Sequence, residues 1–300
     1  MRLLRCLVPL AAALSASAWA QSVTDDPYIW LEEKDSPRAM AWVEAHNAKT
    51  VANLDPDPRY KPFYDQALAI ATAEDRIPMP GFRNGGIFNF WQDGDHLRGL
   101  WRRTTLADYR SKEPTWRTVL DVDALGKAEG RSWVWKGANC LMPEERLCLV
   151  SLSDGGEDAV EAREFDLATN GFVKGGFFLP RSQPAFDWED ADHLLVSTDW
   201  TGQDLTESGY PYIVKRVTRG QPLAAAHELF RGYKSDVGVF PSVLRDGQGN
   251  TLSLLVRAKD YFHRETFVLN GETADKLALP ERASVSALVG GRVIVSLDED

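Results

Sequence analysis

Serine is the side chain of this sequence that could carry covalent catalysis, and its sequence surroundings decide whether it does. Nucleophilic serines of acyl-transferring hydrolases lie in a G-x-S-x-G turn, which exposes the hydroxyl and directs backbone N–H groups at the developing oxyanion. No G-x-S-x-G occurs in the 300 residues, and the nearest approach, Gly130-Arg131-Ser132, has Val134 in place of the closing glycine. The serines in the most turn-like surroundings have no histidine within several residues; they are Ser151, Ser153, Ser208 and Ser235. We therefore assign no catalytic residue.

The residues that could hold a metal or cofactor are scattered. None of the histidines is paired at metal-ligand spacing; they are His46, His96, His193, His227 and His263. Asp121 to Gly126 imitates the start of a calcium loop, but Leu125 stands at a ligand position and Ser132 stands where a bidentate glutamate is needed. An aromatic group is better explained as the core of strands than as a ligand cage; its members are Phe88, Phe90, Trp91 and Trp101. We expect neither a metal nor a cofactor.

Cys140 and Cys148 are the cysteines that remain once the first twenty residues are set aside. A short polar loop with Pro143 separates them, and strand-like sequence flanks it on both sides. Two strand ends joined in this way bring their Cα atoms within bridging distance, so we predict a disulfide. The alternative is two separately buried thiols, since free cysteine packs as a small hydrophobe.

The first twenty residues have the pattern of a targeting segment. Arg2 and Arg5 precede a short apolar run from Cys6 to Ala16, and Ala18-Trp19-Ala20 fits a small-x-small cleavage site. We expect cleavage after Ala20 and a secreted or periplasmic protein, in a compartment where disulfides persist; the alternative is a buried first helix. Removal of the segment takes away two of the 34 basic side chains and none of the 44 acidic ones, so the formal charge changes from −10 to −12. This balance argues against nucleic acid as a partner, and no apolar run beyond the N-terminus is long enough to span a membrane.

The elements that would position any site are mainly strands. The stretch Leu147–Phe178 predicts three of them in an antiparallel meander. Alternation from Cys148 to Ser153 predicts a first strand with one buried face. Asp154-Gly155-Gly156 and Asn170-Gly171 supply the two turns, and the other strands are expected at Ala159–Phe165 and Phe172–Leu179.

Residues 21–77 differ from the rest, because their apolar residues recur at helical spacing. Ser36 before Pro37 offers an N-cap to a helix that continues to about Leu54. Asp55-Pro56-Asp57-Pro58 breaks it, and a second helix is expected over Tyr60–Ala73. Two amphipathic helices without a third partner of their own must bury their apolar faces elsewhere.

From residue 78 onward short strands recur with Asp-Gly, Asn-Gly and Gly-Gly pairs between many of them, which is typical of a sandwich, barrel or propeller. Outside the meander they are expected at 86–92, 97–104, 116–122, 133–136, 193–198, 212–216, 251–258, 264–269, 274–279, 284–288 and 292–297. At about 40 to 50 residues per blade, residues 78–300 hold roughly four or five blades. The expected organisation is a signal peptide over 1–20, a helical segment over 21–77 and an incomplete β-propeller over 78–300.

Three stretches resemble the prolyl oligopeptidase family of serine peptidases. LSDGGEDAVEAREFDL with FVKGGFFLP looks like a blade of its propeller, DPYIWLEE at Asp26–Glu33 is similar to its N-terminal segment, and the region Asn89–Tyr109 is similar to its first blade. The sequence departs from the family pattern at two places. Asp154 stands where the family usually has a basic residue, and Val217-Thr218 stands where Trp and a basic residue are common. These departures indicate divergence from the family but leave the fold assignment unchanged. The resemblance implies a mainly β fold, a partial propeller of a seven-bladed type preceded by helices. It also implies short peptides as ligands, admitted by the propeller to an α/β-hydrolase domain that carries a Ser/His/Asp triad and that we expect to be missing here. In the resembled family the N-terminal helices pack on that domain. Without it we expect five apolar residues to be less buried than those of the meander; they are Trp42, Val43, Phe63, Leu68 and Ile70.

Two functions agree with this sequence. The first is the N-terminal and propeller part of an exported serine-type, proline-specific peptidase, inactive alone. The second is a non-enzymatic periplasmic propeller that binds a ligand or a protein. The coding sequence after codon 300 distinguishes them, because only the first requires a downstream G-x-S-x-G-G.

Overall fold

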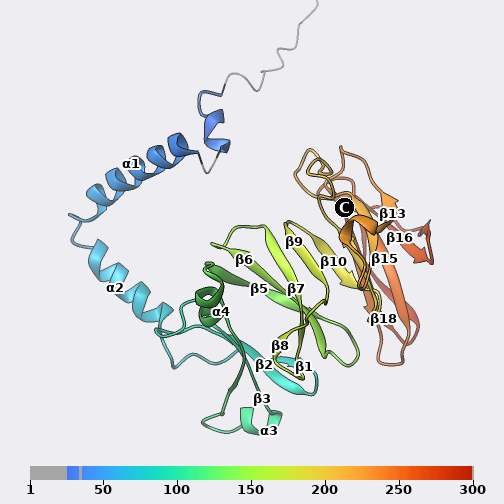
Figure 1. Ribbon diagram of the computed structural model, residues 1–300, viewed down its shortest axis with the longest axis horizontal. Coiled ribbons are helices and arrows are strands. Elements are labelled where there is room, and N and C mark those ends of the chain that lie inside the picture. The colour runs from blue at the N-terminus through green and yellow to red at the C-terminus, as the bar shows by residue number, and fades with distance from the viewer. Residues whose placement is uncertain (1–25, 34–35, 299–300) are drawn as a thin grey trace, which may run out of the picture. The chain divides into compact units, whose positions relative to one another are not determined.

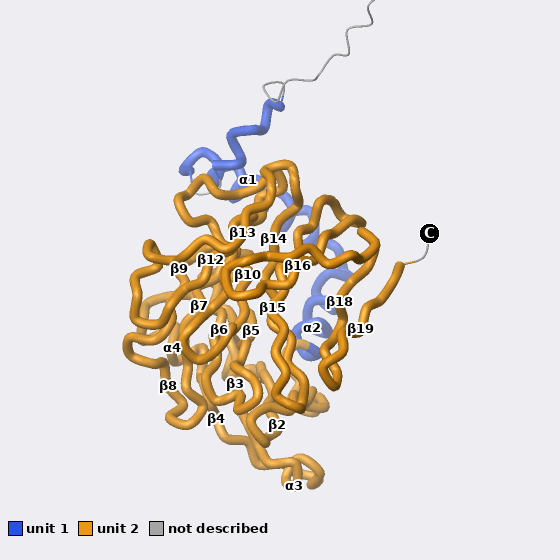
Figure 2. The backbone as a smooth tube through the Cα atoms, turned by 90° about the vertical axis from the view of Figure 1, so that its right-hand side faces the viewer, with its two compact units in different colours: residues 1–70 blue, residues 71–300 orange. Residues whose placement is uncertain are grey.

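The computed structural model describes residues 26–33 and 36–298. The predicted leader and its cleavage site after Ala20 lie outside the described residues. The chain divides into two compact units, residues 1–70 and 71–300 (Figure 2). In the described part, no helix combines the length and apolar character needed to cross a membrane.

The first unit is helical. It contains the short 3-10 helix η2 (Ile29–Glu32) and α1 (Pro37–Leu54), and α2 (Tyr60–Ala71) ends just beyond it. The Ser36 hydroxyl accepts a hydrogen bond from the Ala39 N–H at 3.2 Å, with Pro37 as the first helical residue, so the predicted cap and both helices are confirmed. The apolar side chains of the two helices are poorly buried, as expected. Trp42 is half-buried, and Val43, Phe63, Leu68 and Ile70 are exposed.

The second unit is a series of antiparallel sheets, one after another along the chain (Figure 1). The first sheet is β1 (Gly81–Arg83), β2 (Gly86–Trp91), β3 (Leu100–Thr104) and β4 (Arg117–Asp121). The second is β5 (Trp133–Cys140), β6 (Leu147–Asp154), β7 (Val160–Asp166), β8 (Gly171–Phe172) and β9 (Phe178–Ser182). The third is β10 (Ala185–Trp188), β11 (His193–Ser197), β12 (Ile213–Thr218) and β13 (His227–Arg231).

The fourth sheet is β14 (Gly238–Arg245), β15 (Thr251–Ala258), β16 (Arg264–Asn270) and β17 (Thr273–Lys276), and β18 (Ala283–Val289) pairs with β19 (Arg292–Leu297). Short helices α3 (Leu106–Tyr109), α4 (Val122–Glu129) and η3 (Leu223–Ala225) lie between strands. Four sheets and a two-stranded fifth agree with the four to five blades expected of a partial propeller.

Three hydrophobic cores lie between successive sheets. Trp101 and Phe88 of the first sheet pack with Val150 and Phe165 of the second. The core between the second and third sheets is built around Trp188. The core between the third and fourth sheets combines Leu195, Ile213 and Val214 with Val239, Val243 and Leu255. Each sheet is therefore held by burial against its neighbour.

The structure corrects several strand predictions. β6 is buried on both faces, because the first sheet covers one face and the third sheet covers the other. The strand expected over Phe172–Leu179 is broken into β8 and β9 by a turn in which the Gly176 N–H donates to the Val173 carbonyl at 3.0 Å. The sequence patterns also missed β1, β10, β13, β14 and the helices α3 and α4.

Candidate functional site

A cavity of about 750 Å³ lies between the second, third and fourth sheets, and we call it the inter-sheet cavity. Its lining comes chiefly from the first strand of each sheet, β5, β10 and β14, and from the residues that lead into them. The lining residues are Lys136, Asn139, Ser151, Asp158, Val160, Gln183, Pro184, Ala185, Phe186, Tyr210, Phe240 and Pro241. A volume of this size suits a small molecule or a short stretch of peptide.

One wall of the inter-sheet cavity is apolar and aromatic. The rings of Tyr210 and Phe240 meet edge to face, with centroids 6.2 Å apart and planes at 73°. Tyr210 is 45% exposed, so its ring faces solvent as well as Phe240. Such a wall can bind apolar side chains of a ligand by burial, with the phenol hydroxyl left in contact with water.

The other wall is polar. Lys136 Nζ donates to the Gly156 carbonyl at 3.3 Å, and Asn139 Nδ2 donates to Asp187 Oδ1 at 3.3 Å. Lys136 and Asp158 bring one charge of each sign to the lining. These groups can orient a peptide backbone or its charged ends, but they include no activated nucleophile.

Asp187 and its neighbours connect the three first strands around the cavity. Asp187 Oδ2 accepts the Val243 N–H of β14 at 2.7 Å, and Trp188 Nε1 donates to the Asn139 carbonyl of β5 at 2.9 Å. Arg245 donates to the carbonyls of Trp188 at 2.7 Å and Glu189 at 2.8 Å. Burial lowers the pKa of Arg245, against the opposing influence of the nearby carboxylate of Asp187. We call these bonds the inter-sheet clasp; they fix the relative positions of the strands that line the cavity.

The histidines of the second unit lie beside carboxylates, and not beside serines. His96, His193 and His263 each approach the aspartate three residues earlier, with Nδ1–Oδ1 distances of 2.9, 3.0 and 2.9 Å. The hydrogen bond to Asp93 raises the pKa of His96, and the hydrogen bond from His263 lowers the pKa of Asp260 to about 2. Within residues 26–33 and 36–298 no hydrogen bond joins a histidine to a serine, and no cluster of three metal-binding side chains occurs. The described residues thus assemble no catalytic triad.

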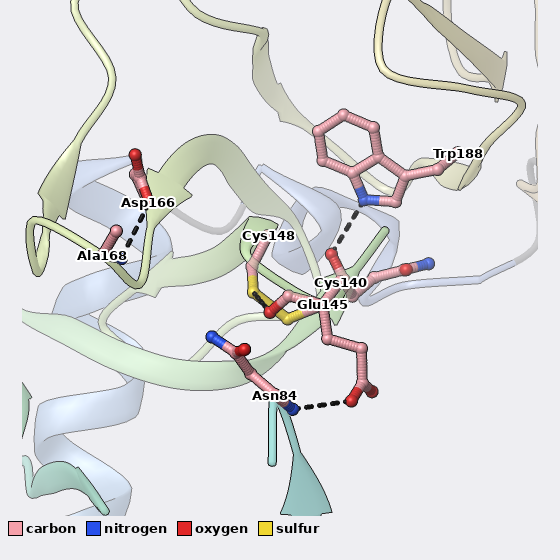
Figure 3. Close-up of a disulfide and its surroundings, with 8 residues drawn as sticks. Asn84, Cys140, Glu145, Cys148, Asp166, Ala168 and Trp188 are labelled. Atoms are coloured by element: carbon pink, nitrogen blue, oxygen red, sulfur yellow. Dashed lines mark hydrogen bonds between the residues drawn. A yellow bond between two sulfur atoms is a disulfide. The ribbon is translucent and has the colours of Figure 1, made fainter. Parts of the chain in front are cut away.

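Cys140 and Cys148 occupy directly opposed positions of β5 and β6, and their sulfur atoms are bonded at 1.94 Å (Figure 3). The loop between them reaches the first sheet, because Glu145 Oε2 accepts the Asn84 N–H at 2.8 Å. Trp188 of the clasp donates its bond close to the disulfide (Figure 3). The disulfide therefore links the two strands of the β5–β6 hairpin, whose loop contacts the first sheet through Glu145.

Sequence patterns did not indicate the cavity lining. β10 and β14, which supply Ala185, Phe186, Phe240 and Pro241, were not predicted at all. The aromatic group expected to be core is buried at Phe88, Trp91 and Trp101 and half-buried at Phe90, whose ring stacks on Trp135.

Comparisons with known proteins agree with this geometry. Residues 16–298 match the family described as prolyl oligopeptidase, N-terminal beta-propeller domain. The chain is 48% identical over 287 residues to the uncharacterized peptidase y4nA of Sinorhizobium fredii, covering 94% of this chain and 40% of that protein. It is 28% identical over 257 residues to the uncharacterized peptidase RP174 of Rickettsia prowazekii, covering 82% of this chain and 35% of that protein.

Solved structures show the same fold. A post-proline cleaving enzyme from Rickettsia typhi superposes with a TM-score of 0.81 at 26% identity, over 86% of this chain and 39% of that one. Oligopeptidase B from Leishmania major superposes with a TM-score of 0.64 at 12% identity, over 90% of this chain and 40% of that one. The chain thus spans about two fifths of the length of these relatives. With the family match over residues 16–298 and the succession of sheets, these likenesses show that the chain belongs to the prolyl oligopeptidase family, of which it is an N-terminal propeller region.

Proposed function

We propose that this chain is the propeller part of an exported serine-type peptidase and that its inter-sheet cavity helps to admit short peptides to a hydrolase domain. The observation that carries the proposal is the family match over residues 16–298 together with relatives that are called peptidases. A cavity bounded by an aromatic wall and by isolated charged and amide groups suits an extended peptide. In such an enzyme a serine attacks the scissile carbonyl with help from a histidine, and an aspartate orients that histidine.

We also propose that the protein is exported. The leader pattern of residues 1–20 supports this, and so does the disulfide between Cys140 and Cys148, because disulfides form and persist chiefly in oxidising compartments. N-terminal sequencing of the protein from a periplasmic fraction tests the proposal. Gln21 as the first residue supports it, and an intact Met1 in the cytosolic fraction refutes it.

The purified chain should hydrolyse no proline ester or amide, because acyl transfer needs a nucleophile, a base and an oxyanion hole held together. A chromogenic proline ester and a fluorophosphonate that labels activated serines test this expectation. The Rickettsia typhi post-proline cleaving enzyme is the positive control. Stoichiometric labelling with turnover would mean that this chain has its own active site.

The admitting role is tested in a chimera that carries this chain in place of the matching region of the Sinorhizobium fredii relative. Ala185→Trp fills the inter-sheet cavity, and Ala128→Trp places the same side chain on the exposed face of α4 as a control. We expect Ala185→Trp to slow cleavage of a proline-containing octapeptide while sparing a small proline ester. The admitting role would be refuted if Ala185→Trp and Ala128→Trp cleaved the octapeptide at the same rate as each other and the small ester at the same rate as each other.

A further inference from the structure

Two arginines of the first sheet differ from most arginines of the propeller. In this acid-rich chain, several arginines of the second unit pair with carboxylates, as Arg219 does with Glu164 at 2.9 Å and Arg257 with Asp236 at 2.8 Å. Arg103 and Arg117, by contrast, take part in no ion pair, side-chain hydrogen bond or ring contact with any residue that the structure describes. Their guanidinium groups are available to a ligand.

Arg103 and Arg117 also face each other. They are directly opposed across the antiparallel pair β3 and β4. Side chains in such positions start with Cβ atoms only about 4.5–5.5 Å apart, and like charges placed there destabilise the pair. An anion between the two guanidinium groups would turn this repulsion into two attractive interactions.

The two arginines open into a cavity of about 590 Å³, which we call the arginine cavity. Thr104, Thr105 and Thr115 also line it, and the hydroxyls of Thr105 and Thr115 can donate to a ligand beside the guanidinium groups. The cavity has one carboxylate, Asp108, whose Oδ2 is already engaged by the Thr104 hydroxyl at 2.9 Å and the Thr115 N–H at 2.8 Å. Two arginines and one aspartate leave the lining with an excess positive charge, against the negative charge of the whole chain.

We propose that the arginine cavity binds an oxyanion group, held between the guanidinium groups of Arg103 and Arg117 with the hydroxyls of Thr105 and Thr115 as further donors. Planar guanidinium groups suit ligands with two or more acceptor oxygens. Phosphate and the carboxylate of a peptide share this chemistry, and the volume leaves room for the rest of a small ligand. The site is separate from the inter-sheet cavity, so it does not depend on the function proposed above.

The test is a titration of the purified chain at low ionic strength in a chloride buffer. Inorganic phosphate is one arm, and Gly-Gly-Glu with a free C-terminus is the other, with potassium chloride at matched ionic strength as the blank. Calorimetry measures binding, and the thermal midpoint measures stabilisation. We expect saturable binding in at least one arm, and Arg103→Gln or Arg117→Gln should weaken it about tenfold, the loss of one charge-assisted contact.

Arg110→Gln is the matched control, since Arg110 is an exposed arginine near α3 that does not line the arginine cavity. Binding that is unchanged in Arg110→Gln and weakened in the other two variants supports the site. No saturable binding in either arm overturns it, as does equal weakening by all three substitutions. Without added ligand, Arg103→Gln should keep or raise the thermal midpoint because it removes the repulsion. A fall larger than that of Arg110→Gln would show that Arg103 is already satisfied within the protein and would also overturn the proposal.

Discussion

The carboxylate of Asp187 accepts the backbone N–H of Val243 at 2.7 Å, which joins the first strands of the third and fourth sheets. Replacement by alanine leaves that N–H and the Asn139 amide without their acceptor. We expect Asp187→Ala to lower the free energy of unfolding by about 1–3 kcal/mol. Urea denaturation measures the loss, with Asp192→Ala, whose side chain is 70% exposed, as the control. Equal midpoints for the two variants would contradict the structural role of the clasp.

The disulfide should be present in the protein as isolated. Thiol titration of the unreduced, denatured mature protein should find no free thiol, and two titratable thiols would refute the bond. The cysteines are eight residues apart, so the closed loop is short. Changing both cysteines to serine should then lower the free energy of unfolding by about 2–3 kcal/mol, which is the loop-entropy contribution expected for a loop of this length.

The Asp93–His96 pair predicts a pH dependence of stability. The hydrogen bond to Asp93 raises the pKa of His96 from its ordinary value of 6.5. A raised pKa in the folded state stabilises the fold fully below pH 6.5, and this stabilisation is lost as the pH rises through the folded value. The difference in unfolding free energy between the parent and His96→Gln should therefore be larger at acidic than at alkaline pH. His46→Gln controls for loss of an imidazole, and a difference independent of pH would refute the coupling.

Two phenylalanines should respond very differently to truncation. Phe165 is 1% exposed in the core between the first and second sheets, whereas Phe63 of α2 is 66% exposed. Phe165→Ala should cost about 3–5 kcal/mol because it leaves a cavity, and Phe63→Ala should change stability by less than about 0.5 kcal/mol. Chemical denaturation followed by tryptophan fluorescence measures both, and similar losses would contradict the burial.

Local turn chemistry explains which strands the sequence could predict. Asn170 and the glycines at 155 and 156 adopt positive φ, and they end strands where their types indicate. The error at Phe172–Leu179 has a local cause too, since Gly175 has a φ of 72° and the chain turns there. The apolar residues on both sides of Gly175 and Gly176 favoured one continuous strand, so the sequence did not indicate a turn at these glycines.

Burial on both faces could not be deduced from alternation. Leu149 alternates with Cys148 and Val150, so a strand with one buried face would leave Leu149 exposed. It is fully buried because the third sheet covers that face of β6. Ser153 is buried as well, and its hydroxyl donates to the Glu157 carbonyl at 2.7 Å. The inter-sheet cavity was not predicted for the same reason, because its walls meet only when three successive sheets pack together and bring residues between 136 and 241 to one place.

The sharing of cores between successive sheets has a consequence for folding. Trp101 and Phe165 belong to different sheets but to one core, and so do Leu195 and Val239. A single sheet that formed early would expose a bare apolar face, so the smallest cooperative folding unit is a pair of adjacent sheets. Order should then spread from pair to pair as in a one-dimensional array with nearest-neighbour coupling. Amide protons of β6, flanked by two cores, should consequently exchange last.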